Sequence, residues 1–200
     1  MSTNANSRAA AHPIDPLFLE RWSPRAFLDQ PISESELLTL LEAARWAPSS
    51  YNSQPWRFAY ARRGTGHWPT FLGLLNEFNQ SWAKNAAALV FVASNPLMRP
   101  PGADKDVPSY SHSFDAGAAW ASLALQAVRL GLQAHAMVGV DFAKAAEVLG
   151  LPAGYRVEAA IAIGKPGDKS QLPEGLQARE QPSPRRTLAE IAAEGRFTAA

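Results

Sequence analysis

The stretch Ala47-Pro48-Ser49-Ser50-Tyr51-Asn52-Ser53-Gln54-Pro55-Trp56 separates two regular patterns in a chain of 200 residues. Before it, over residues 33–46, leucines and alanines recur at helical spacing, and Ser33 with Glu36 forms a capping-box pattern. After it, aromatic residues alternate with Arg and Ala over residues 56–61, which is typical of a strand. The proline at its second position disfavours helix for the residue before it. The stretch is therefore predicted to be a polar connection from a helix to a strand.

Outside this connection, helical and strand patterns alternate along the chain without an internal repeat. Residues 86–93 are continuously apolar, so we expect a strand covered on both faces. Residues 113–130 keep the helical period most clearly, and the proline-rich residues 95–111 predict a loop. The further predictions are a helical stretch over residues 71–78, strands over 134–140 and 155–163, and helices over 142–149 and 188–192. This order predicts a layered α/β or α+β domain.

The composition predicts a folded chain with one domain. Hydrophobic residues make up 46% of it and charged residues 18%, so it can bury a sizeable core. Residues 1–12 show no periodicity and are predicted to be a flexible tail, which leaves residues 13–200 as a single domain. The last part of that domain, about 166–200, has too few apolar positions to pack as a unit. We expect it to run over another surface, such as that of a second subunit.

The charge balance and the absence of cysteine exclude several classes of function. The 19 basic and 18 acidic residues leave a formal charge of +1, which gives no electrostatic case for binding nucleic acid or an anionic membrane. A chain without cysteine has no disulfide, thiolate nucleophile or iron–sulfur cluster, so redox chemistry would need a bound cofactor. No signal-peptide pattern is visible, and the longest apolar stretch, Ala86 to Ala93, is too short to span a bilayer. We therefore expect a cytoplasmic protein.

Three polar segments could carry chemistry. In Arg21-Trp22-Ser23-Pro24-Arg25, two guanidinium groups with a hydroxyl between them could converge on one phosphate. In residues 47–56, the Ser, Asn and Gln side chains supply both donors and acceptors, which suits the edge of a heterocycle. The third segment is Pro184-Arg185-Arg186-Thr187-Leu188. Taken alone, the first segment is more typical of solvated arginines before a turn. The second is also typical of an ordinary helix-to-strand connection, and the third of a solvated charge pair or a helix start.

Their order along one chain carries a resemblance. The series Arg21-x-Ser23-x-Arg25-x-Phe27, then Ala43-Ala44-x-x-Ala47-Pro48-Ser49-Ser50-x-Asn52-x-Gln54-Pro55-Trp56-x-Phe58, resembles the opening of the nitroreductase family of FMN-dependent oxidoreductases. The further matches are Asn79-Gln80, Asp115-x-Gly117-Ala118, Leu130-Gly131-Leu132, Gly164-x-Pro166, Arg185-Arg186-x-Leu188 and Glu194-Gly195-Arg196-Phe197. The resemblance covers about residues 14–197. In two places the chain departs from the family, because Ser122 stands where many members carry Asn and Thr187 replaces a common Pro.

The resemblance implies an α+β fold with three layers, in which a mostly antiparallel central sheet is flanked by helices. It also implies an intertwined homodimer with two FMN sites at the subunit interface, each chain embracing the other with its residues 166–200. Substrate pockets in the family vary in the region that corresponds to residues 95–111. His112, directly after that region, is expected to be a helix-start or surface residue rather than an acid.

The resemblance also implies which residues bind the cofactor. Those expected at the FMN phosphate and ribityl chain are Arg21, Trp22, Ser23 and Arg25, with Arg185 and Arg186 closing on the phosphate. Asn79 is expected at the pyrimidine edge of the flavin, and Met137, Val138 and Gly139 along the ring near N5. The residues expected to reach the flavin of the partner subunit are Pro48, Ser49, Ser50, Asn52 and Gln54.

The implied activity is hydride transfer from NADH or NADPH through FMN to a small acceptor, such as a nitroaromatic or a quinone, by a ping-pong mechanism. Because the cofactor carries the hydride, no catalytic side chain and no metal ion are expected. One alternative is a flavin-binding protein for storage or sensing that does not turn over. Another is a specialised member of the family, such as a reductive dehalogenase or a flavin-fragmenting enzyme. Nucleic-acid binding by the segment Arg179–Arg186 is the most distant alternative.

Overall fold

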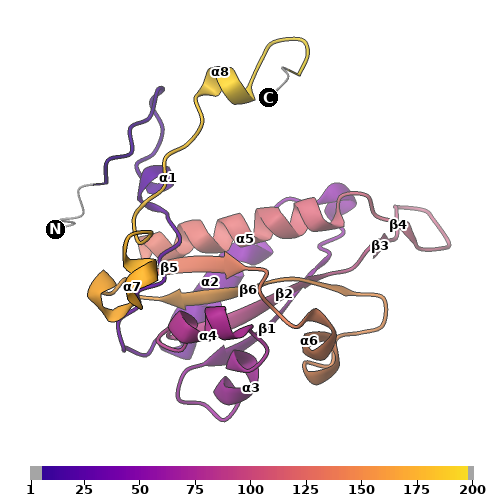
Figure 1. The fold of residues 1–200 in the computed structure, drawn as a ribbon. Helices are drawn as coiled ribbons and strands as arrows, with labels where there is room; N and C mark the ends of the chain where they lie inside the picture. The colour runs from indigo at the N-terminus through magenta and orange to yellow at the C-terminus, as the bar shows by residue number, and fades with distance from the viewer. Residues whose placement is uncertain (1–5, 198–200) are drawn as a thin grey trace.

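The computed structural model describes residues 6–197, so the first five residues of the expected tail lie outside the described residues. Its centre is a four-stranded sheet in the order β1-β2-β6-β5. These strands are β1 (Trp56–Arg62), β2 (Ala88–Ser94), β6 (Arg156–Gly164) and β5 (Gln133–Met137). Each pairs with its neighbour in the antiparallel direction (Figure 1). The strand patterns in the sequence are confirmed, although β5 ends at Met137 rather than at residue 140.

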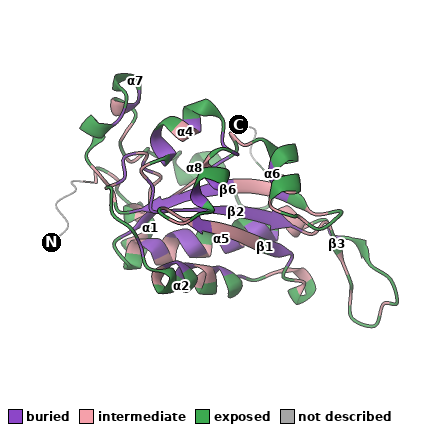
Figure 2. Ribbon diagram, turned by 90° about the horizontal axis from the view of Figure 1, so that it is seen from below, coloured by how far each residue is buried: buried purple, intermediate pink, exposed green. Residues whose placement is uncertain are grey.

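Helices cover both faces of this sheet. On one face lie α2 (Glu34–Arg45) and the long α5 (His112–Arg129), which pack against Val90 and Val92 of β2. On the other lie α3 (Trp68–Leu72), α4 (Glu77–Ala83) and α6 (Phe142–Val148), which pack against Leu89 and Phe91. Every residue of β2 is buried, and Figure 2 shows the buried sheet between its half-exposed helices. This confirms the prediction of a strand covered on both faces and of an α+β fold with helices flanking the sheet.

The local signals that predicted α2 and α6 are present in the structure. The Ser33 side chain accepts a hydrogen bond from the Glu36 N–H, and Glu36 reaches back to the Ser33 N–H, which completes the capping box. The Asp141 side chain caps α6 by accepting from the Lys144 N–H.

The prediction of one helical stretch over residues 71–78 was wrong. Helix α3 ends at Leu72 with Gly73 as its C-cap, and Leu75 then forms an antiparallel bridge with Val140. A new helix, α4, begins after Asn76, whose side chain caps it. Pairing with a distant residue interrupts the helix here, and periodicity within the segment cannot reveal it.

Two predictions about the connections need refinement. The expected loop over residues 95–111 contains a small hairpin of β3 (Leu97–Met98) and β4 (Val107–Pro108), which projects from the sheet. Part of the C-terminal region packs on its own chain, because Leu172 and Leu176 are buried in the core beside η2 (Lys169–Gln171) and in α7 (Glu174–Gln177). Residues 183–197, with α8 (Leu188–Ile191), are exposed and extend away from the sheet (Figure 1). Within residues 6–197, no helix is long and apolar enough to cross a membrane.

Candidate functional site

The segment Arg21–Arg25 follows the short α1 (Leu17–Glu20), and side chains from distant parts of the chain hold its backbone. Gln133, at the start of β5, accepts a hydrogen bond from the Trp22 N–H at 3.2 Å and donates to the Glu20 carbonyl at 3.1 Å. One carboxylate oxygen of Glu180 accepts from the N–H groups of Arg25 and Ala26 at 2.7 and 2.8 Å. These contacts fix the direction in which the Arg21–Arg25 side chains leave the backbone.

His135, in β5, also contacts the backbone of the Arg21–Arg25 segment. Its Nδ1 lies 2.9 Å from the Pro24 carbonyl oxygen, and because that oxygen can only accept, Nδ1 carries the hydrogen. The ring packs against Trp82, with 4.7 Å between the ring centroids. Burial lowers the pKa of His135 to about 4, and the charges of Arg25 and Arg21 act in the same direction. His135 is therefore a neutral support at neutral pH.

Several guanidinium groups gather at this segment. Burial lowers the pKa of Arg21, and the positive charge of Arg185 lowers it further, so these two side chains interact despite their separation in sequence. Burial also lowers the pKa of Arg25, with a further contribution from Arg179 that Glu180 partly offsets. Arg185 and Arg186 are both exposed, but Arg186 does not contribute to the lowered pKa of Arg21 or of Arg25.

The charges in this cluster are not neutralised by carboxylates. Among the described residues, Arg21 and Arg185 have no carboxylate oxygen within 4.0 Å of their side-chain nitrogens. The Nε of Arg25 is buried and has no hydrogen-bond partner within the same residues. Ser23 accepts a long hydrogen bond of 3.4 Å from Arg21, which places a hydroxyl among the cations. This donor set has the chemistry of an anion site.

A second group of polar atoms lies at the other end of β5. The Gly139 carbonyl accepts hydrogen bonds from the Asn76 N–H at 3.0 Å and from the Asn79 side chain at 3.2 Å. A Cβ on Gly139 would lie only 2.3 Å from Asn79 Nδ2, so no larger residue fits without displacing Asn79. Neighbouring Val138 is 70% exposed, and Met137 is buried beneath it. In the described part of the chain the Gly139 N–H has no acceptor, so it is free to donate to a ligand.

Strand β5 connects these two groups. His135 supports the cations, and Gly139 lies four residues further along, which is about 13 Å of extended chain. An elongated ligand with an anion at one end and a hydrogen-bonding ring at the other matches this layout.

The connection over residues 48–54 has an unusual backbone. Tyr51, Asn52 and Gln54 have positive φ angles of 51°, 53° and 46°, in the left-handed region that residues other than glycine rarely adopt. Asp115 holds this strained loop, because its buried carboxylate accepts from the Ser50 N–H at 3.1 Å and from the Ser111 hydroxyl at 2.9 Å. Ser49 accepts from the Gln54 N–H at 3.0 Å. Strained backbone that is held from outside is a frequent property of ligand sites.

This loop and the cation cluster lie at opposite ends of α5. Ser50 contacts Asp115 in the first turn, whereas Asp15, just before α1, pairs with Arg129 in the last turn at 3.2 Å. Asp115 and Arg129 are fourteen positions apart, which is about 21 Å of helix. The structure therefore brings Arg21, Arg25 and Arg185 together, and separately Asn79 and Gly139, but within one chain it does not bring the 48–54 loop to the cation cluster.

Comparison with known proteins decides the family. The model of the nitroreductase family matches residues 19–67 and 68–165. This chain belongs to the nitroreductase family.

Its relatives in the family include proteins with and without an assigned activity. A solved structure of an oxidoreductase containing FMN is 52% identical, with a TM-score of 0.93 and full coverage of both chains. An uncharacterised 15.4 kDa protein of Mycolicibacterium smegmatis is 37% identical over 150 residues, which cover 70% of this chain and 97% of that protein. An NADH dehydrogenase of Thermus thermophilus is 27% identical over 180 residues, 76% of this chain and 85% of that protein.

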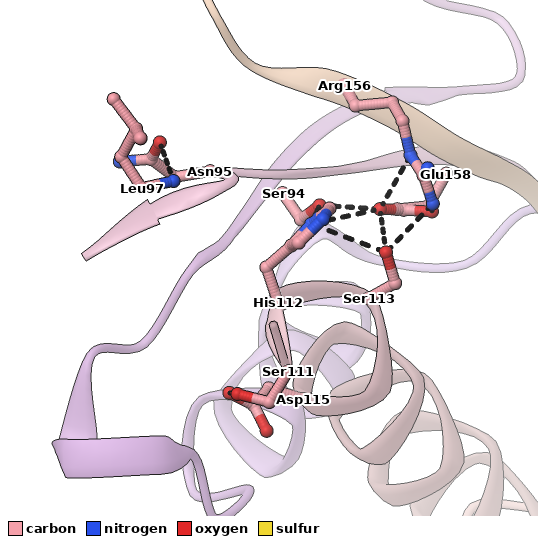
Figure 3. A network of polar contacts seen from close by, with 9 residues as sticks. All are labelled: Ser94, Asn95, Leu97, Ser111, His112, Ser113, Asp115, Arg156 and Glu158. Atoms are coloured by element: carbon pink, nitrogen blue, oxygen red, sulfur yellow. Dashed lines mark hydrogen bonds and ion pairs between the residues drawn. The ribbon is translucent and has the colours of Figure 1, made fainter. Parts of the chain in front are cut away.

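This nitroreductase-family chain also has a polar network that sequence reasoning missed (Figure 3). Ser94 Oγ lies 2.8 Å from His112 Nδ1 and donates to Glu158 at 2.5 Å, and Ser113 donates to Glu158 at 2.9 Å. Burial opposes the ionisation of Glu158, but hydrogen bonds from Arg156, Ser94 and Ser113 outweigh it and lower its pKa. His112 begins α5 as expected, but its side chain is only 16% exposed, so it is not a surface residue.

The network has a structural role at the base of the hairpin. Ser94 directly precedes residues 95–111 and His112 directly follows them. The contact between Ser94 and His112 therefore joins the two ends of this connection. Ser94 is fully buried and its hydroxyl donates to a carboxylate, which is not the arrangement of an activated nucleophile. Arg156 and Glu158 of this network also line a cavity of about 550 Å³ between α6 and β6. A second cavity, of about 570 Å³, lies beside Trp22. Among residues 6–197, no three His, Asp or Glu side chains converge in a way that could hold a metal ion.

Proposed function

We propose that this chain is an FMN-dependent oxidoreductase that transfers reducing equivalents from NADH or NADPH to a small acceptor, such as a nitroaromatic or a quinone. The observation that carries the proposal is a cluster of arginines that has no ion pair with a carboxylate among the described residues and lies near the start of β5, together with a glycine just beyond the end of β5 whose N–H has no acceptor there. FMN has the matching shape, with a phosphate at one end and a ring with a polar rim at the other. When bound, FMN supplies the hydride-transfer chemistry, and the protein supplies position and electrostatics.

The cation cluster fits the phosphate and the ribityl chain. Arg21, Arg25 and Arg185 would neutralise the phosphate, and the buried Arg25 Nε would gain the partner that it otherwise lacks. Ser23 offers a hydroxyl to the same end, and Trp22 lies between the two arginines. Arg186 would join only by moving its exposed side chain.

The Asn79–Gly139 pair fits the flavin ring. Asn79 is 7% exposed and is fixed by its contact with the Gly139 carbonyl, so its remaining polar atoms can face the pyrimidine edge. The Gly139 N–H can donate to a ring nitrogen, and the absence of a side chain there leaves room for Asn79 and Asn76 to pack against the backbone. Val138 and Met137 provide apolar contact for the ring.

A second copy of the chain would complete the site. Because residues 48–54 lie about 21 Å along α5 from the cation cluster of their own chain, we place Pro48, Ser49, Ser50, Asn52 and Gln54 at the FMN of another chain. The exposed aromatic residues Trp46, Tyr51 and Phe114 lie beside this loop in sequence or at the start of α5, and they support a partner surface there. We therefore propose a homodimer in which each flavin lies between a cation cluster and the partner's 48–54 loop.

The named relatives support this proposal. The oxidoreductase that is 52% identical contains FMN, and the relative from Thermus thermophilus is an NADH dehydrogenase.

The test is the visible spectrum of the protein reconstituted with FMN, before and after anaerobic addition of NADH or NADPH. Flavin absorbance that stays with the protein and is bleached rapidly is the expected result. Arg21→Ala is expected to lose FMN, whereas Arg62→Ala, on the opposite edge strand β1, retains it. Failure of the wild-type protein to bind FMN would contradict the proposal. Binding without bleaching would favour storage or sensing over catalysis.

A further inference from the structure

Arg8 is a half-buried arginine in the N-terminal segment, outside the residues that resemble the family. Its Nε donates to the Ser183 carbonyl at 2.8 Å, and its NH1 donates to the carbonyls of Leu19 and Arg21 at 3.2 and 2.8 Å. One side chain thus joins the backbone of the Arg21–Arg25 segment to the segment that carries Arg185. Among the described residues, the hydrogen bond from Arg8 is the only one that joins Ser183 to the N-terminal segment.

Arg8 also adds charge to the cation cluster. Burial lowers its pKa, and the positive charges of Arg185 and Arg21 lower it further. Within residues 6–197, none of these three side chains has a carboxylate oxygen within 4.0 Å. Three neighbouring like charges repel one another unless an anion lies among them, and the NH2 group of Arg8 makes no hydrogen bond within the described chain that would occupy it.

We propose that Arg8 is a further phosphate-binding and positioning residue of the FMN site. It holds Arg21 and the Arg185 segment in place through their carbonyl groups, and it contributes a third positive charge beside them. This inference rests on the proposed function, since the phosphate in question is that of FMN. It implies that the N-terminal segment is part of the cofactor site and that phosphate binding stabilises the segment.

The test compares FMN with riboflavin, which has the same ring but no phosphate. Apoprotein of the wild type, Arg8→Ala, Arg8→Lys and the control Arg62→Ala is titrated with each flavin, and binding is followed by quenching of flavin fluorescence. Arg8→Ala is expected to weaken FMN binding about tenfold, as for the loss of one charge-assisted contact, and to leave riboflavin binding unchanged. Arg8→Lys is expected to fall between the wild type and Arg8→Ala, because one ammonium group keeps the charge but cannot bridge both segments.

Two results would overturn the role of Arg8. One is wild-type affinity for FMN in Arg8→Ala while Arg21→Ala still weakens it, which would leave the proposed function intact. The other is an equal loss of FMN and riboflavin, which would show a purely structural role. If the wild-type protein binds neither flavin, the proposed function itself fails.

A measurement on the wild-type protein covers the case in which Arg8→Ala does not fold. Amide hydrogen exchange of residues 6–12 is followed in the apoprotein, with riboflavin and with FMN. Slower exchange with FMN than with riboflavin is expected, because only the phosphate meets Arg8. Equal exchange rates with both flavins would overturn the proposal.

Discussion

The Arg21–Arg25 segment and the 48–54 loop are both polar connections next to helices, but they are stabilised in opposite ways. Residues 21–25 have no positive φ angle, and the side chains of Gln133, His135 and Glu180 hold them from outside. The 48–54 loop carries three left-handed residues and depends on one buried carboxylate, Asp115.

The difference between the two regions indicates different tasks. A charged segment that distant side chains fix can bind an anion without rearranging. The free energy needed to bring the positive charges together is then part of folding and not of binding. A strained, exposed loop at the far end of α5 presents its polar groups outward, towards another molecule. The two regions therefore make sense as halves of one site that lie on different chains.

The largest expected effect is on the loop half. Asp115→Ala removes the acceptor of the Ser50 N–H and of the Ser111 hydroxyl, and it should lower the free energy of unfolding by about 3 kcal/mol. Denaturant titration of the apoprotein measures this change. Ser111→Ala, which removes only one of the two contacts, is the control and should have a smaller effect. Equal stability of Asp115→Ala and the wild type would show that the loop holds its strained backbone without Asp115.

An effect of similar maximum size, which is only partly lost until the pH falls to 4, is expected in the cation half. The pKa of His135 is about 4 in the folded chain and near 6.5 when unfolded, so the unfolded chain binds the proton more readily. The contribution of His135, up to about 3 kcal/mol, is complete above pH 6.5 and is lost as the pH falls from 6.5 towards 4. The measurement is the free energy of unfolding across this range, in the wild type and in His135→Asn, which has no titrating ring. If the stability of the wild type falls with decreasing pH no more steeply than that of His135→Asn, the half-buried, neutral state of His135 is contradicted.

The smallest effect distinguishes two neighbouring arginines. Arg185 interacts with Arg21, whereas Arg186 does not, so Arg185→Ala should weaken FMN binding by roughly 1.5 kcal/mol and Arg186→Ala by less than about 0.5 kcal/mol. Titration of both apoproteins with FMN gives the comparison. A loss in Arg186→Ala as large as that in Arg185→Ala would show that residues 183–197 change position when the cofactor binds.

Much of the fold could be predicted from the sequence, because its determinants are local. The capping box at Ser33, the cap at Asp141 and the continuously buried run of β2 each act within one element. The break between α3 and α4 could not be predicted, since it depends on the pairing of Leu75 with Val140. The hairpin within residues 95–111 depends on a pairing of the same kind.

The candidate site likewise contains residues that the sequence reveals and residues that only the folded chain reveals. Its motif residues, such as Arg21 and Arg25, stand out in the sequence because a family shares them. The residues that support them, Gln133, His135 and Glu180, have no fixed spacing from the motif, so only the folded chain connects them. Asp115 is visible in the sequence only as an acidic residue suited to the first turn of a helix.

The central claim is that each cofactor site combines the cation cluster of one chain with the 48–54 loop of another. Mixed dimers test it most directly, with the double variant Arg21→Ala/Arg25→Ala in one chain and Ser50→Trp, which blocks the loop, in the other. Neither variant alone should retain FMN. The mixed dimer, isolated with two affinity tags, should bind one FMN per dimer with wild-type affinity, because it contains one intact cluster facing one intact loop. Absence of FMN from the mixed dimer, or full binding by the Ser50→Trp homodimer, would contradict the claim.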